Sequence, residues 1–200
     1  DRRKGCFSLN TIEILEGVAS HIGAALMRKQ AEEEVQIQRQ RLAYIIEGTH
    51  VGTWEWNVQT GETVFNEMWA QMIGYTLDEL APISIKTWET CLHPDDLKQS
   101  AELLERHFAD ELPYYDYECR IKHKDGHWVW IQDRGRVITR TGDGKPLMMF
   151  GTQTDITERK QSEEKLIATN RNLEIATIRA NDLADKYEIA NIAKSEFLAN

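Results

Sequence analysis

The distribution of glycine and proline is the feature that most limits how this chain can fold. All four prolines lie between residues 82 and 146, and glycine is missing between Gly23 and Gly48 and again after Gly151. Since these two residue types are the strongest helix breakers, both flanks are predicted to form long helices. The middle, roughly Gly48 to Thr157, is predicted to form the folded domain.

The middle segment carries short alternating patterns that are typical of strands. Predicted strands cover residues 54–58, 63–65, 115–121, 128–138 and 147–154, and helical patterns cover residues 67–73 and 97–112. In the third strand, bulky residues from Tyr115 to Ile121 alternate with charged ones, so one face is predicted to be buried and the other wetter. About 110 residues suffice for an independent hydrophobic core.

The second flank has the most regular periodicity in the chain. The first row of a heptad pattern consists of Leu166, Leu173, Ala180 and Tyr187, and the second of Thr169, Ala176, Leu183 and Ala190. Such a repeat over more than three heptads favours a coiled coil, although its small residues make the seam weak. The alternative is a surface helix packed on its own domain.

The first flank has a less continuous apolar stripe. Apolar residues recur at helical spacing from Ile12 to Leu26, the segment 27–41 is polar, and apolar positions return at Leu42, Ile45 and Ile46. A single continuous helix is therefore compatible with the sequence, but a single continuous packing face is not.

Composition excludes several classes of protein. The net charge of -9 is spread over interspersed acidic and basic residues, which argues against a nucleic-acid surface. No apolar run approaches the roughly 20 residues of a membrane span, and no leader opens the chain. The three cysteines, Cys6, Cys91 and Cys119, are widely spaced, as in reduced cytoplasmic proteins. The chain is therefore expected to be cytoplasmic, although a longer protein could be anchored in a membrane elsewhere.

Five motifs in the middle segment resemble successive signatures of PAS domains. They are Gly52–Asn57, Trp88 with His93–Asp96, Tyr117–Ile121, Lys124–Ile131 and Gly151–Lys160. They follow the order and spacing of that family over about Arg41 to Lys160. The resemblance implies an α+β fold with a five-stranded antiparallel sheet, helices on one face, and long flanking helices of which the C-terminal one is a coiled coil.

Two shorter resemblances suggest how the chain is divided. Residues 1–31 are similar to the last helix of a GAF domain, and Ala193–Asn200 resembles the start of a histidine-kinase dimerisation and phosphoacceptor helix. The intervening parts are then a linker helix at 32–47, the PAS domain at 48–157 and a coiled-coil signalling helix at 158–192. In the kinase family Met-Ser-His would follow the last segment, and this His accepts phosphate.

These resemblances imply a sensory and signal-transmitting part of a two-component sensor histidine kinase. The parent would pass phosphate from ATP to its own His and then to a response regulator, and this chain, without that His or the ATP-binding domain, should be inactive alone. It is expected to form a homodimer through its flanking helices. The alternatives are a structural relay spacer without ligand and a haem- or flavin-binding sensor.

Two groups of residues are candidates for the signalling role. Asp155, Ile156 and Thr157 mark the passage from the last strand to the second flanking helix, where Asp155 could cap that helix together with Glu158. The predicted dimer contacts are Leu166, Leu173, Ala176, Ala180, Leu183 and Tyr187.

Four tryptophans form two alternating pairs, Trp54 with Trp56 and Trp128 with Trp130. Each pair is expected to pack in the core. The alternative for Trp128 and Trp130 is an outer face that Leu42, Ile45 and Ile46 or a second subunit covers.

No cofactor or metal is evident in the sequence. PAS domains hold haem, flavin, small metabolites or nothing, and Cys91 does not lie in the motif that light-sensing members use for flavin chemistry. His107, on the predicted helix 97–112, is a single histidine and a weak haem candidate. His93 is interpreted as structural because Pro94-Asp95-Asp96 marks the start of a helix.

Overall fold

The computed structural model describes residues 9–199, so residues 1–8 of the predicted GAF-like segment and Asn200 lie outside the described part. The chain divides into one unit that ends at His50 and another that begins at Val51. Among the described helices, none combines the length and the apolar character that a membrane span needs.

Long helices flank the central domain, as the distribution of glycine and proline predicts. Helix α1 (Leu9–Thr49) is continuous for 41 residues, so it runs through the predicted boundary between residues 31 and 32. Helix α6 (Thr157–Ala199) is continuous for 43 residues. The GAF-like and phosphoacceptor-helix assignments of the two ends remain predictions.

The central domain is built on a five-stranded antiparallel sheet. Its strands are β1 (Gly52–Asn57), β2 (Thr63–Phe65), β3 (Tyr115–Lys122), β4 (Trp128–Arg140) and β5 (Pro146–Asp155). Their order in the sheet is β2-β1-β5-β4-β3, and all neighbours are antiparallel. The predicted fold class is confirmed, and each predicted strand overlaps an observed one.

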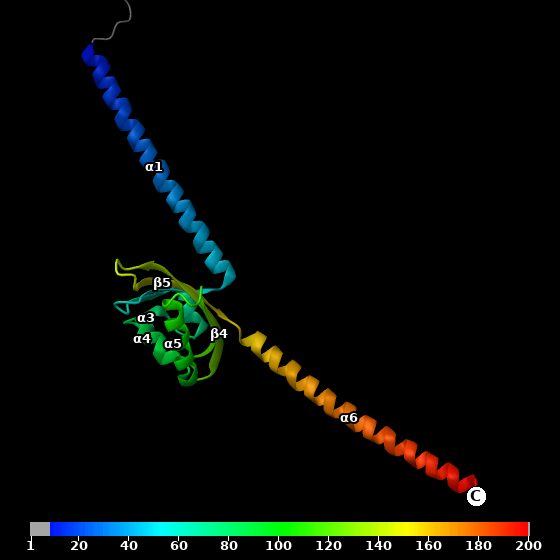
Figure 1. Ribbon diagram of the computed structural model, residues 1–200. Helices are drawn as coiled ribbons and strands as arrows, with labels where there is room; N and C mark the ends of the chain where they lie inside the picture. The colour runs from blue at the N-terminus through cyan, green and yellow to red at the C-terminus, as the bar shows by residue number, and fades with distance from the viewer. Residues whose placement is uncertain (1–8, 200) are drawn as a thin grey trace, which may run out of the picture. The chain divides into compact units, whose positions relative to one another are not determined.

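Four helices connect β2 to β3 and gather on one face of the sheet (Figure 1). They are α2 (Glu67–Met72), α3 (Leu77–Leu80), α4 (Ile85–Cys91) and α5 (Pro94–Phe108). The short helices α3 and α4 were not among the predicted elements, and α3 is too short to show a period, although Thr76 and Glu79 form a capping box there.

The helical pattern 97–112 extends too far at its C-terminal end, whereas Pro94-Asp95-Asp96 correctly marks the start of the observed helix. Helix α5 begins at Pro94 because His93 caps it through Nδ1, which accepts from the backbone N–H of Asp95 at 3.2 Å. It ends at Phe108 because Asp110 takes a left-handed conformation with φ 60°.

Strand alternation places the core between the sheet and these helices. The inward side chains of β3 and β4 include Cys119, Ile121, Val129 and Ile131, all buried. Trp54 projects from β1 over the backbone of Gly151 and Gly135, where a Cβ atom at either glycine would collide with its ring. Both glycines are therefore needed for the indole to lie against the sheet.

Candidate functional site

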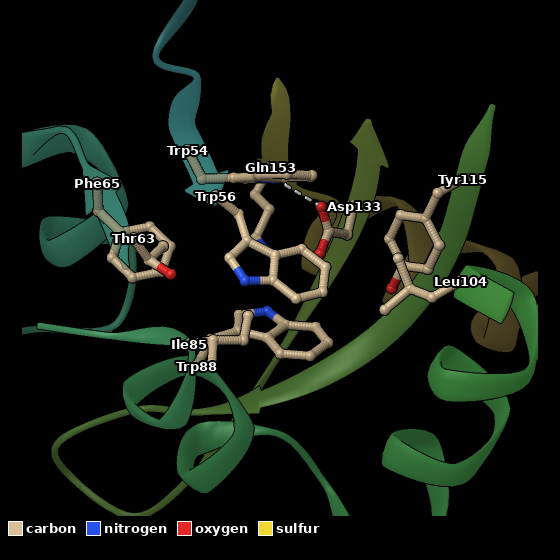
Figure 2. Close-up of a pocket in the computed structure, with 10 residues that line it drawn as sticks. All are labelled: Trp54, Trp56, Thr63, Phe65, Ile85, Trp88, Leu104, Tyr115, Asp133 and Gln153. Atoms are coloured by element: carbon tan, nitrogen blue, oxygen red, sulfur yellow. Dashed lines mark hydrogen bonds between the residues drawn. The ribbon is translucent and has the colours of Figure 1, made fainter. Parts of the chain in front are cut away.

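A small, partly open cavity of about 30 Å³ lies between the sheet and the helices. Figure 2 shows the side chains that line it, which are mostly aromatic or aliphatic: Trp54, Trp56, Thr63, Phe65, Ile85, Trp88, Leu104, Tyr115, Asp133 and Gln153. They come from β1, β2, α4, α5, β3, β4 and β5. Most strands and helices of the central domain therefore contribute to the cavity wall. A change in what the cavity holds would alter the contacts of most of these elements.

Asp133 is a buried carboxyl group at one side of this cavity. Its Oδ1 accepts a hydrogen bond from Nε1 of Trp54 at 2.8 Å, and its Oδ2 accepts one from Nε2 of Gln153 at 2.7 Å. Gln153 in turn accepts from Nε1 of Trp69 at 2.6 Å through its Oε1. The four side chains form one buried polar network that joins β1, α2, β4 and β5.

The environment of Asp133 favours its neutral form. Burial raises its pKa to about 7, although the hydrogen bonds from Gln153 and Trp54 work in the opposite direction. Asp133 is thus a carboxyl group that can gain or lose a proton near neutral pH inside the core.

Two other indole groups at the cavity are not satisfied. The Nε1 atoms of Trp56 and Trp88 are buried and have no hydrogen-bond partner among the described residues. The Trp88 side chain itself is almost completely enclosed, at 6% exposed. Buried N–H groups without an acceptor are rare in native proteins. These two indole N–H groups therefore indicate that a molecule bound in the cavity accepts their hydrogen bonds.

The start of α6 is held by two hydrogen bonds to the backbone of Trp130, near the beginning of β4. The N–H of Trp130 donates to Oγ1 of Thr157 at 3.0 Å, and the N–H of Ile156 donates to the carbonyl of Trp130 at 2.8 Å. The N–H of Thr157 donates to Oδ1 of Asp155 at 2.8 Å. The Asp155 side chain therefore accepts from the first N–H of the helix, from the position before the N-cap residue Ile156, and no hydrogen bond of the Glu158 side chain is found in the described part of the chain.

Side chains reinforce the same junction on the other face of the sheet. Glu118 of β3 pairs with Arg159 at 2.5 Å and with Lys160 at 2.6 Å. These bonds, to Lys160 first and Arg159 second, lower the pKa of Glu118. The Trp130 ring has the Lys160 ammonium 5.1 Å and the Arg120 guanidinium 5.4 Å from its centroid.

The two tryptophan pairs lie on opposite faces of the sheet. Trp54 and Trp56 line the cavity, whereas Trp128 and Trp130 alternate with the inward Val129 and Ile131. Core packing of the second pair is therefore the wrong expectation: cationic side chains lie over both rings, and Lys122 is 5.1 Å from the Trp128 ring. The alternation allowed both arrangements, and the burial of Val129 and Ile131 decides between them.

The remaining candidates are not among the residues that line the cavity. Leu42 and Ile45 belong to the first unit and are exposed. The predicted coiled-coil residues are all exposed along α6: Leu166, Leu173, Ala176, Ala180, Leu183 and Tyr187. Both ring nitrogens of His107 are engaged, with Nδ1 at 2.8 Å from the Leu112 carbonyl and Nε2 accepting from the N–H of Val137 at 3.0 Å. His107 is therefore a structural residue.

The sequence argument missed the polar part of the site. Asp133 follows Val129 and Ile131 at inward positions of β4, so a polar residue at this place in the alternation was a readable signal. The pairing of Asp133 with Trp54 and Gln153 and the cavity wall formed by Trp88 and Tyr115 had no signal in the sequence, because these residues come from separate elements.

Comparison with known proteins agrees with this architecture. Residues 62–153 match a family model described as PAS fold. A solved structure of a sensory box histidine kinase/response regulator from Burkholderia thailandensis superposes with a TM-score of 0.59 and 29% sequence identity, over 67% of this chain and 98% of that one.

Two curated proteins share sequence with the chain. A methyl sulfide methyltransferase-associated sensor from Methanosarcina acetivorans is 29% identical over 134 residues, which are 66% of this chain and 13% of that protein. A blue-light-activated histidine kinase from Brucella anthropi is 27% identical over 179 residues, 87% of this chain and 34% of that protein. The chain thus spans about a third or less of the length of these relatives.

Proposed function

The central domain is a PAS domain similar to those of sensor histidine kinases, and from this premise we propose that the chain is a sensory and signal-transmitting module of such a kinase. The domain would sense a state inside its core, and α6 would carry the result toward a phosphoacceptor helix. The parent would phosphorylate its own His and then a response regulator.

The observation that carries this proposal is the junction between β4 and α6. The backbone of Trp130 makes two hydrogen bonds with the segment that starts the helix: its carbonyl accepts from the N–H of Ile156, and its N–H donates to the side-chain hydroxyl of Thr157. Because Trp130 lies between the inward residues Val129 and Ile131 of the core, a shift of β4 moves the first turn of α6 directly. A few kcal/mol of differential binding inside the domain suffices to shift such an equilibrium.

The second part of the proposal is that α6 works as a parallel dimer. Its heptad residues leave large apolar side chains in solvent, with Leu173 64% and Tyr187 65% exposed. A stripe of this kind is stabilised when a second copy covers it. Two α6 helices in register would transmit rotation or a change of register from a pair of PAS domains.

The relay is tested in a kinase that contains this chain in its natural place. We expect Thr157→Val and Asp155→Ala to reduce the dependence of autophosphorylation on signal, because they remove the acceptors for Trp130 and Thr157. Glu62→Gln, an exposed change in the turn between β1 and β2, is the matched control. Unchanged signal dependence in both junction variants would refute the relay.

A further inference from the structure

The cavity in the PAS core has an excess of hydrogen-bond donors. Nε1 of Trp56 and Nε1 of Trp88 border it without acceptors among the described residues. Leaving two N–H groups unmet in a dry space is unfavourable, whereas a bound acceptor would satisfy them.

The other polar groups of the cavity wall already have partners. Both oxygens of Asp133 accept hydrogen bonds from neighbouring side chains. The hydroxyl of Tyr115 pairs with Oγ of Ser100 at 2.9 Å, and the Thr63 hydroxyl donates to the Gly61 carbonyl at 3.2 Å. The groups that still need a partner are therefore the N–H donors of Trp56 and Trp88, and a ligand that can only donate hydrogen bonds would leave both without one.

The charge of the wall limits the ligand further. No Lys, Arg or His is present among the ten lining residues, and the ionisable groups there are the acidic side chains of Asp133 and Tyr115. An anion would lie beside Asp133 without a compensating cation, which is strongly unfavourable in a buried site. A cation would be compatible with the aromatic rings and Asp133, but it would not accept from Trp56 and Trp88.

The cavity volume of about 30 Å³ limits the size of a ligand that can bind there. A cavity of this size accommodates a ligand of only a few non-hydrogen atoms. This is far less than the several hundred Å³ of a site for a large organic cofactor. A flavin or haem would require the surrounding elements to move apart.

We propose that this cavity binds a small uncharged molecule with a hydrogen-bond-accepting oxygen, of the ketone or aldehyde class, held by Nε1 of Trp56 and Nε1 of Trp88. The inference names the ligand class for the proposed sensory function and rests on it. Binding would draw α4, which carries Trp88, and β1, which carries Trp56, toward a common partner.

The test uses nuclear magnetic resonance of the six tryptophan indole N–H groups in the 200-residue chain. Four probes are titrated into the millimolar range, because so few atoms cannot bind tightly: acetone, acetate, methylammonium and xenon. They are comparable small probes that differ in charge and in the ability to accept a hydrogen bond. The signals of Trp54 and Trp69, whose acceptors are internal, and of Trp128 and Trp130 serve as controls.

We expect acetone to move the Trp56 and Trp88 indole proton signals downfield in a saturable way, with smaller changes at the four control signals. Acetate and methylammonium should leave all six unchanged, and xenon should give no downfield movement. Saturable shifts of these two signals by an ion instead of acetone would overturn the proposal. So would the absence of a response to every probe, which would mean that the cavity holds water only.

Two variants locate the effect. Trp88→Phe keeps an aromatic ring but removes the donor, and we expect acetone affinity to fall about three- to tenfold, the range of one neutral hydrogen bond. Trp128→Phe, on the opposite face, should leave it unchanged. If Trp88→Phe does not fold, as judged by circular dichroism, Trp56→Phe replaces it. Failure here leaves the junction experiment at Thr157 unaffected, so the ligand class and the relay are tested separately.

Discussion

Nε1 of Trp54 donates a 2.8 Å hydrogen bond to Oδ1 of Asp133, although the two residues are 79 positions apart in the chain. The Trp54 ring reaches the carboxylate by lying across Gly151 of the adjoining strand β5 and Gly135 of β4, the next strand in the sheet. This contact therefore depends on the register of the sheet, on the absence of side chains at the two glycines and on the buried carboxyl group of Asp133. The first predictions concern these three features.

Replacing Trp54 with Phe should weaken the folded state by about 1–3 kcal/mol. The change removes one of the two donors to Asp133 and leaves a buried oxygen without a partner. Urea unfolding followed by circular dichroism measures the difference. Trp128→Phe, which alters a half-buried ring on the outer face, is the matched control and should change stability by less than half as much. Equal effects would mean that the hydrogen bond contributes little.

Gly151→Ala should be strongly destabilising, by about 3 kcal/mol or more, or prevent folding. An added Cβ would collide with the Trp54 ring and with the carbonyl of Arg134. Gly142→Ala is the control, since its surroundings are open and its φ is not in the left-handed region. Thermal unfolding of the two variants gives the comparison. A small effect of Gly151→Ala would show that the Trp54 ring can move aside at little energetic expense.

The stability of the domain should decrease as pH rises from about 4 to about 7. In this range the folded chain keeps a proton on Asp133, whose pKa burial raises to about 7, while the unfolded chain has lost it. The unfolded state binds fewer protons, so the free energy of unfolding falls with pH and then levels off. Burial also raises the pKa of Tyr115 and of Cys119, so neither thiol nor phenol titrates there.

Urea unfolding at several pH values tests this, with Asp133→Asn as the comparison. The variant cannot ionise, so its stability should lose the decrease between about pH 4 and pH 7. Asp96 acts in the opposite sense: burial raises its pKa, but the hydrogen bonds from Arg120 outweigh burial and lower it. Its contribution is lost only as pH falls below about 4. A wild-type profile parallel to that of Asp133→Asn would contradict the assignment.

The junction should be visible in hydrogen exchange. Thr157→Val removes the acceptor of the Trp130 N–H while keeping the size of the side chain. We expect exchange at Trp130 and in the first turn of α6 to accelerate about tenfold, while the amide of Ile131 changes little. Thr157→Ser retains the hydroxyl and should resemble the wild type. Acceleration spread evenly over the sheet would indicate general destabilisation instead of a local loss.

The proposed dimer depends on the heptad seam. Leu173→Asn should increase the dimer dissociation constant at least about tenfold in analytical ultracentrifugation, because it places an amide in the apolar seam. Ile175→Asn makes a comparable change on the same helix outside the seam and should leave association nearly unchanged. A wild-type chain that is monomeric across micromolar concentrations, or a larger effect of Ile175→Asn, would argue against this seam.

The sequence by itself determined the division of this chain into two long helices and a sheet domain. Glycine and proline act locally, so their absence from 158–200 is enough to allow α6 to run from Thr157 to Ala199. Alternation likewise set β2 at Thr63–Phe65 and placed Trp128 and Trp130 on a common face. These features depend on neighbours within a few residues.

Only the tertiary structure decided which face is inside and what the core contains. Period-two alternation is symmetric between the faces of a sheet, so it cannot tell that Trp54 faces the helices and Trp130 faces the cations. The raised pKa of Asp133 and the unmatched N–H of Trp88 arise from groups brought together by strand order and helix packing. Burial and the directions of hydrogen bonds exist only once those distant segments meet.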